Sequence, residues 1–431
     1  MRPSAVAGNS FYLCLSLFAF ALGSIPARAA IPAGPPGPAA ESKPASVAIP
    51  DVYTWLPETL ARSRQRVRDG DPLLQPALER LRGEAEKELT GDLVKVTDKP
   101  DDLAATVGGK NNYASVSGYF WPQKGKPDAP WVMRDGAVNT AMIDKFDGPR
   151  MKTLQQRVIT CSLAYYFTGD TRYARRAAEQ LRVWFIDPET RMNPHMEYGQ
   201  CVPNKSKGEP WGIIDVNNFP YLLDAVNLLG DSGEWSAEDN AALRAWFVPF
   251  TDWLWTSSLG QRERAAKNNH GTFYDLIVAR CALFAGDEAL ARRVVEAFGP
   301  ERIAVQVEPD GATPHEQKRA YSAMYTCWNL KGMADMLFLA RRLDVDLWAY
   351  KSNDGRSLRQ AALWLRPYVE EPKRWTFGDG KFKKTAPTEF FWMVTAATGD
   401  KKIGAFFREN MTAPQQTEWR RSRWMLLLPL E

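Results

Sequence analysis

The sequence predicts an all-α protein made of stacked helical hairpins. From Pro50 onward, apolar residues recur at helical spacing over long stretches, and runs with the alternation of a β-strand are hard to find. Five breaks recur along the chain, at Gly169-Asp170, Gly230-Asp231, Gly286-Asp287, Leu343-Asp344 and Gly399-Asp400. The aspartates are 56 to 61 residues apart, which is enough for two helices with their connections.

Each break has the chemistry of a helix end followed by a helix start. A glycine suits the left-handed position after the last turn of a helix, and an aspartate side chain can cap the next helix. The flanking text repeats as well, since YYFTGDTRYARRAAEQL resembles ALFAGDEALARRVVEAF. The repeating unit is therefore a helical hairpin, and the period alone leaves open whether the hairpins form an open solenoid or a ring.

The N-terminus predicts export. Arg2 precedes the apolar stretch FYLCLSLFAFAL, and Ala27-Arg28-Ala29 supplies a small-x-small cleavage pattern, so residues 1–29 are typical of a signal peptide. Residues 30–49 are rich in Pro, Ala, Gly and Ser and indicate a flexible linker. We expect residues 50–431 to form one domain, located in the periplasm or secreted by a Gram-negative bacterium, with no membrane attachment after cleavage.

Composition narrows the class of protein further. With 45% hydrophobic and 25% charged residues among 431, the chain has the balance of a globular protein with a large core. Cleavage would remove two arginines and no acids, so the net charge falls from +4 to +2, which does not indicate a nucleic-acid partner. No CxxC spacing is present, so we do not expect a zinc site. We also expect no cofactor. Apolar helical text surrounds Cys161, Cys281 and Cys327, which predicts buried thiols.

Three segments interrupt the helical pattern with polar, aromatic and proline-rich text, as binding loops often do. They are residues 113–139, 191–218 and 308–316. The first contains Trp121, a candidate for stacking on a sugar ring. The second contains Gln200, Lys205 and Asp215 as candidate substrate contacts, although Asp215 is equally typical of a helix cap.

The sharpest local feature is KNNHGTFYDL, just before an apolar helix. Asn268, Asn269 and His270 place several donors at a helix start, where free backbone N–H groups and the helix dipole favour an anion such as a carboxylate. The alternative is that an asparagine merely caps the helix and His270 packs. Tyr274 follows in the same motif as a further candidate contact.

A second feature is DGATPHEQKRAYSAMYTCWNL, in which a helix is predicted to begin near Pro314. Tyr321 and Tyr325 are spaced to share a helix face. Arg319 and Tyr325 are six residues apart, so on a regular helix they would point in different directions, and sharing a substrate would require a distortion. An aromatic stripe packed in the core is the alternative.

These motifs resemble the alginate-lyase superfamily of bacterial polysaccharide lyases. The segments TRMNPHMEYGQ, WGIID and YFWPQKGKP resemble it too, so the likeness extends over about residues 110 to 400. The resemblance implies an (α/α) toroid, an incomplete barrel of helical hairpins. It also implies that Asn269, His270, Arg319 and Tyr325 are catalytic, with Tyr321 a competing choice for the tyrosine. The sequence departs from the family pattern at Asn111-Asn112-Tyr113 and at Glu209-Pro210-Trp211, which leaves the polymer open.

The expected reaction is β-elimination on a β-1,4-linked uronic-acid polymer, either alginate (polymannuronate) or glucuronan. Asn269 would neutralise the carboxylate, Tyr325 would act as base and acid with its pKa lowered by Arg319 and His270, and His270 is the alternative base.

Two other functions are compatible with parts of the sequence. One is a glycoside hydrolase that uses paired carboxylates such as Asp215, Asp310 or Glu316, and it gives no role to the Asn-Asn-His cluster. The other is a non-catalytic helical repeat protein that binds polysaccharide.

Overall fold

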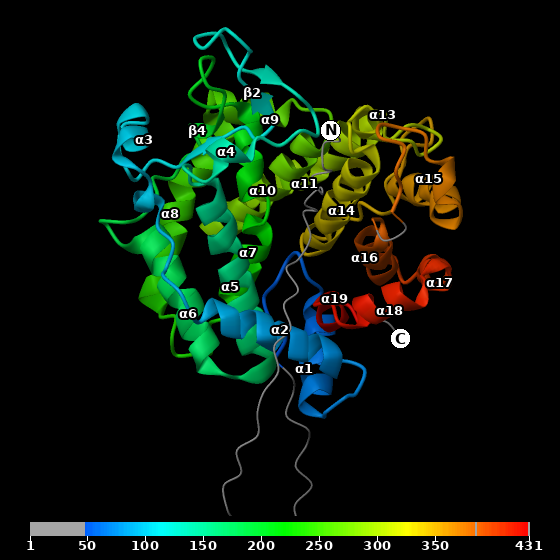
Figure 1. Cartoon of the computed structure of the whole chain (residues 1–431). Coiled ribbons are helices and arrows are strands. Elements are labelled where there is room, and N and C mark those ends of the chain that lie inside the picture. The colour runs from blue at the N-terminus through cyan, green and yellow to red at the C-terminus, as the bar shows by residue number, and fades with distance from the viewer. Residues whose placement is uncertain (1–47, 384–385, 430–431) are drawn as a thin grey trace, which may run out of the picture. The chain divides into compact units, whose positions relative to one another are not determined.

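The computed structural model describes residues 48–383 and 386–429 (Figure 1). The predicted signal peptide and all but the last two residues of the predicted linker lie outside this range. Within it, the helices are α1 (Pro57–Arg68), α2 (Gln75–Glu88), α3 (Asp101–Thr106), α4 (Thr140–Ile143), α5 (Gly148–Thr168), α6 (Thr171–Leu181), α7 (Phe219–Asn227), α8 (Ala237–Thr256), α9 (Ser258–Arg264), α10 (Asn269–Ala285), α11 (Glu288–Phe298), α12 (Ala304–Gln306), α13 (Pro314–Gln317), α14 (Ser322–Arg341), α15 (Leu358–Glu370), α16 (Thr388–Thr398), α17 (Lys401–Asn410), α18 (Ala413–Arg420) and α19 (Trp424–Leu427).

Successive helices pack against one another around a ring (Figure 1). α5 contacts α6 and α7, α7 contacts α10, α10 contacts α11 and α14, and α14 contacts α16. α19 then packs against α1 and α2, where Arg423 pairs with Glu84 at 2.9 Å. The predicted all-α class and the helical toroid are therefore confirmed.

Helix α10 has the central place in this arrangement. It contacts α7, α8, α9, α11 and α14, and all but three of its residues are buried. A helix that is covered on nearly all sides has no need of a polar face. This explains why the residues after the KNNH motif are almost all apolar.

The predicted helix breaks are mostly confirmed. Gly169, Gly286 and Gly399 adopt positive φ angles of 75°, 94° and 69° at helix ends. The aspartate after each of these glycines caps the next helix.

Two breaks differ from the prediction. A loop follows Asp231, and Ser236 caps α8 instead, with its hydroxyl accepting from the backbone N–H of Asp239. Asp344 itself takes the left-handed conformation, with φ of 58°, and α15 begins fourteen residues later, at Leu358.

The few strands lie in two of the three irregular segments. β1 (Ala114–Val116) pairs in parallel with β4 (Tyr198–Cys201), and β2 (Phe120–Trp121) pairs antiparallel with β3 (Val132–Met133). In Figure 1, β2 and β4 lie at the same end of the ring as α9 and α13. That end therefore collects the segments that the sequence marked as unusual.

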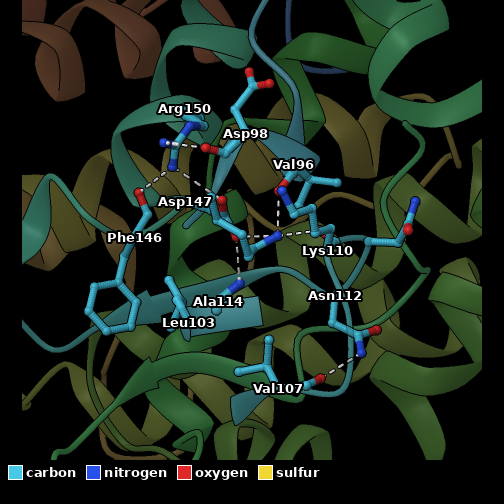
Figure 2. A network of polar contacts seen from close by, with 12 residues as sticks. Val96, Asp98, Leu103, Val107, Lys110, Asn112, Ala114, Phe146, Asp147 and Arg150 are labelled. Atoms are coloured by element: carbon cyan, nitrogen blue, oxygen red, sulfur yellow. Dashed lines mark hydrogen bonds and ion pairs between the residues drawn. The ribbon is translucent and has the colours of Figure 1, made fainter. Parts of the chain in front are cut away.

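A buried ion pair fastens the segment that leads into β1 (Figure 2). The ammonium of Lys99 lies 3.0 Å from Asp147, and both side chains are fully buried. Lys99 also donates to two backbone carbonyls of its own segment. Asp147 accepts from the backbone N–H of Ala114 at 3.0 Å and contacts Arg150. The start of β1 is thereby tied to the N-terminus of α5.

Three predicted thiols are indeed buried, at Cys161, Cys281 and Cys327. Within the described ranges, no helix combines the length and the apolar character that crossing a membrane requires.

Candidate active site

The start of α10 supplies three of the predicted site residues, and their environments differ. Asn268 caps the helix, since its side-chain oxygen accepts from the backbone N–H of His270 at 3.3 Å. The capping alternative is therefore correct for Asn268. Its amide nitrogen takes part in none of the hydrogen bonds of the described residues and remains free to donate.

Asn269 does not face a substrate in this conformation. It is fully buried, and its side-chain amide donates to both carboxylate oxygens of Glu316, at 2.8 and 3.0 Å. Its backbone N–H donates to the same carboxylate at 2.5 Å. The expected contact between the Asn269 amide and a substrate carboxylate is wrong for this conformation, because both donors are already used.

His270 is held by a buried acid. Its Nδ1 lies 2.7 Å from Glu263, a residue of α9 whose side chain is 4% exposed. The imidazole itself is partly exposed, and its Nε2 has no hydrogen bond within the described part of the chain. Burial lowers the pKa of His270, but Glu263 and Glu316 raise it by more, so the net pKa lies above the usual value. Glu263 therefore fixes the orientation of the imidazole, and the raised pKa favours its protonated form.

Arg319 and Tyr325 meet because the predicted helix is interrupted. α13 ends at Gln317 and α14 begins at Ser322, and Arg319 lies in the turn between them. The guanidinium carbon lies 3.8 Å from the centre of the Tyr325 ring. Asp135 holds the same guanidinium with two hydrogen bonds, at 3.1 and 3.0 Å. The helix distortion that Arg319 and Tyr325 need in order to share a substrate is thus present.

The interruption also separates the two candidate tyrosines. Tyr321 precedes α14, is 43% exposed, and donates its hydroxyl to the carbonyl of Gly136 at 3.1 Å. The prediction that Tyr321 and Tyr325 share a helix face is therefore wrong.

Tyr325 is 7% exposed, and its hydroxyl lies 2.9 Å from that of Tyr119. Burial raises the pKa of Tyr325 well above its usual range, the Tyr119 hydrogen bond raises it further, and Arg319 lowers it to a smaller extent. The expectation of a lowered tyrosine pKa is wrong for the free protein, because the desolvation of the phenolate outweighs the nearby cation.

Asp215 organises the second irregular segment instead of presenting a free carboxylate. It lies in the 3₁₀ helix Pro210–Val216 and accepts from the hydroxyls of Tyr113 and Ser115, at 2.9 and 2.5 Å. Its other oxygen accepts from the Gln200 amide at 2.8 Å. Burial outweighs these hydrogen bonds and raises the pKa of Asp215.

Gln200 is held in an unusual backbone conformation by this arrangement. Its φ is 47°, in the left-handed region, and its backbone N–H donates to the Ser115 hydroxyl at 2.6 Å. Strained positions of this kind concentrate at functional sites. Gln200 therefore remains a candidate contact, whereas Asp215 acts as a positioning residue.

The other predicted contacts divide into one core residue and two surface residues. Tyr274 is fully buried and donates to the carbonyl of Leu254 at 2.6 Å, so its predicted contact with substrate is wrong. Trp121 is partly exposed, with the Arg134 guanidinium 5.5 Å from its ring. Lys205 is exposed, and its ammonium lies 3.6 Å from Glu209. Trp121 and Lys205 remain compatible with binding.

Several residues that shape this site were not predicted from the sequence in the roles that they have. They are the acids that hold the candidate catalytic groups and the tyrosines and serine beside them: Glu263, Asp135, Tyr119, Tyr113 and Ser115. Tyr119, Tyr113, Ser115 and Asp135 all lie in the flagged segment 113–139, which was the available signal. Glu263 lies in ordinary helical text and carries no local signal.

The carboxylates do not form the facing pair that a hydrolase needs. Glu316 is buried against Asn269, Asp215 accepts from three side chains, and Asp310 accepts from the backbone N–H of Ala312 in an exposed turn. Among the residues that the structure describes, no group of three or more His, Cys, Asp or Glu side chains could hold a metal ion.

Comparisons with known proteins give the family and the fold of the chain. A model of the alginate lyase family matches residues 95–375. The chain is similar to the solved structure of an alginate lyase from Bacteroides ovatus, with 33% identity and a TM-score of 0.83, covering 89% of this chain and 100% of that one. The fold is also similar to that of alginate lyase A1-III from Sphingomonas species A1, with 16% identity and a TM-score of 0.54, covering 90% and 100% of the two chains. A variant of A1-III complexed with a tetrasaccharide has 14% identity and a TM-score of 0.52, covering 83% of this chain and 91% of that one. No curated protein matches the chain.

Proposed function

This chain belongs to the alginate lyase family and is a polysaccharide lyase, and we propose that it cleaves β-1,4-linked uronic-acid polymers, with polymannuronate regions of alginate as the preferred substrate and glucuronan as the next candidate. The products would carry 4,5-unsaturated uronate ends. The name of the Bacteroides ovatus relative supports alginate, and the site supports the reaction type.

The observation that carries this proposal is the environment of Tyr325. Its hydroxyl contacts the Tyr119 hydroxyl, and its ring lies against Arg319. Arg319 also lowers the pKa of His270, so its charge acts on both candidate groups. A phenol, a guanidinium and a polarised imidazole together suit the removal of a proton next to a carboxylate.

His270 takes over the role that the sequence assigned to Asn269. The C5 proton of a uronate becomes acidic only when the adjacent carboxylate is neutralised. A protonated His270, stabilised by Glu263, donates through Nε2 to that carboxylate, and the free amide of Asn268 is placed at the same helix start. Both groups can remain in contact with the enolate-like charge as it develops.

Tyr325 then carries the proton transfer. In its phenolate form it takes the C5 proton, the C4=C5 bond forms, and the C4–O4 bond breaks. The same phenol returns the proton to the departing O4, because both atoms lie on one side of the ring in mannuronate and β-glucuronate. Arg319 stabilises the phenolate while it exists.

Ultraviolet absorbance tests the reaction directly. Purified protein is incubated separately with polymannuronate, polyguluronate and polyglucuronate, and we expect rising absorbance from the C4=C5 bond, fastest with polymannuronate. New reducing ends without this absorbance would indicate hydrolysis. Unchanged polymer in all three incubations would contradict the proposed substrate class.

We further propose that the protein is exported, because its N-terminal text is typical of a cleavable signal peptide. N-terminal sequencing of the mature protein should begin at Ala30. An intact Met1 in protein recovered from the native host would contradict export by this route.

A further inference from the structure

Glu316 is a buried carboxylate that joins two parts of the site. It lies in α13 and is fully buried, yet the proton transfer described above does not use it. Its three hydrogen bonds to Asn269, at 2.5, 2.8 and 3.0 Å, connect residues 47 positions apart in the chain. Placing a carboxylate in such a buried position is costly, and these bonds offset part of that cost.

The contact fixes both the backbone and the side chain of Asn269. The backbone N–H belongs to the first turn of the 17-residue helix α10, where a negative charge also interacts favourably with the helix dipole. The side-chain amide cannot turn over, because its oxygen would then face the carboxylate. That oxygen is left buried and without a hydrogen-bond partner among the described residues.

The same carboxylate is linked to both groups that would act on the substrate. Asn269 precedes His270 directly, and Glu316 precedes Arg319 by three residues, with the Arg319 guanidinium against Tyr325. The contact between Glu316 and Asn269 therefore fixes the position of His270 relative to Arg319 and Tyr325. The break between α13 and α14 interrupts the helical hydrogen bonds that would otherwise connect Glu316 with Tyr325.

We propose that Glu316 is a positioning residue for the elimination reaction, which holds His270 opposite Tyr325 by tying the start of α10 to α13. This inference rests on the proposed function and adds to it the residue that aligns the two halves of the site.

The charge of Glu316 gives the proposal a second consequence. Four charged groups influence or face His270: Glu263 from α9, Glu316 from α13, Arg319 from the turn after it, and Asp215 from the 3₁₀ helix. Glu263 and Glu316 raise the pKa of His270, whereas Arg319 lowers it. Removing the charge of Glu316 while keeping its shape should therefore lower the pKa of His270.

The test compares Glu316→Gln and Glu316→Ala with the control Glu308→Gln. Glutamine keeps the shape of the side chain, and it can accept from the Asn269 backbone while the Asn269 amide turns to accept from it. Glu308 lies eight residues earlier, is 39% exposed and pairs with Arg356 at 3.2 Å, so its substitution removes an exposed charge of the same kind. Each protein is assayed for kcat, KM, the pH dependence of kcat/KM, and thermal unfolding.

For Glu316→Gln we expect the acid limb of kcat/KM to move to lower pH by about one unit, with kcat about ten-fold lower and KM little changed. For Glu316→Ala we expect kcat to fall about a hundred-fold, since the segment loses its alignment. Glu308→Gln should behave as the wild type. Wild-type kcat in Glu316→Ala, or an unshifted pH profile in Glu316→Gln that unfolds normally, would overturn the proposal.

A measurement without substrate separates this inference from the proposed function. The His270 pKa is followed by NMR of its imidazole nitrogens in the wild type and in Glu316→Gln. A lower pKa of His270 in Glu316→Gln supports the contact between α13 and the start of α10, even if no uronate polymer is cleaved. An identical pKa overturns it even if the wild type proves to be an active lyase.

Discussion

The hydroxyl of Tyr325 lies in a largely buried position, between a second phenol and an arginine that packs on its own ring. Replacing it with phenylalanine removes only the hydroxyl and leaves the contact with Arg319. We expect kcat of Tyr325→Phe to fall by about 10²–10⁴-fold, the range for loss of a general acid or base, while polymer binding stays largely intact. Steady-state absorbance assays and calorimetric binding measurements check both parts.

The comparison with Tyr321→Phe makes this assignment specific. The Tyr321 hydroxyl donates to the Gly136 carbonyl at an exposed position, so its loss should cost much less activity. Full activity in Tyr325→Phe together with inactive Tyr321→Phe would reverse the assignment of the tyrosine.

The raised pKa values of Tyr325 and His270 have a joint consequence for pH dependence. The active form needs His270 protonated and Tyr325 ionised, and both pKa values are above their usual ones. The fraction of phenolate rises with pH until His270 begins to lose its proton, so activity should increase with pH up to the pKa of His270 and level off above it. The shift expected for Glu316→Gln is a shift of that acid limb.

Among the secondary-structure elements, β1 is held at its start by a buried ion pair. The ion pair between Lys99 and Asp147 ties the start of this strand to α5. Ser115 in the strand holds Gln200 and Asp215. Burial raises the pKa of Asp147 to about 6, although Lys99 lowers it. The contact between Lys99 and Asp147 therefore stabilises the strand that positions Gln200 and Asp215.

Replacing Lys99 with methionine should destabilise the protein in a pH-dependent way. Asp147 would lose its cation, so its folded pKa would rise further above the ordinary value. A group whose folded pKa is raised binds its proton more tightly in the folded state, so the stability it contributes is lost as pH rises from about 4 through the folded pKa. We expect Lys99→Met to cost about 3–5 kcal/mol near pH 8 and less near pH 5, as measured by urea unfolding.

Lys110→Met provides the matched control in the same segment. The Lys110 ammonium pairs with Asp101 at 2.7 Å, and both side chains are exposed, so its loss should cost under about 1 kcal/mol at either pH. An equal and pH-independent loss in both variants would contradict the role assigned to the buried pair.

At the scale of the whole molecule, closure of the ring depends on the short helix α19. Its residues Met425, Leu426 and Leu427 are buried, and it packs against α1 and α2 at the beginning of the described chain. We expect Leu426→Ala to cost about 2–5 kcal/mol, because a fully buried leucine leaves a cavity. Hydrogen exchange should then increase in α1 and α2 as well as in α19.

Leu363→Ala is the control for this effect, since Leu363 is 44% exposed on α15. It should change stability by less than about 0.5 kcal/mol. Increased exchange confined to α19 in Leu426→Ala would show that the two ends of the chain are not coupled.

Much of the fold could be predicted because helix ends are local. The glycine and aspartate at 169–170, 286–287 and 399–400 act on backbone groups a few residues away, so these helix ends can be predicted from the local sequence. The same holds for Asn268, which caps α10 from the adjacent position. The family motifs likewise placed the site at the start of α10 and around α13, and the structure brings those segments to one end of the ring.

The sequence by itself therefore determined the helical class, several helix ends and the segments that form the candidate site. Only the tertiary structure decided which partners Asn269, Arg319 and Tyr325 have, because those partners lie far away in the chain. Tyr119 is 206 residues from Tyr325, and Asp135 is 184 residues from Arg319. The pKa of Tyr325 and the engagement of Asn269 were mispredicted for the same reason: both depend on burial and on hydrogen bonds that exist only once the ring has packed.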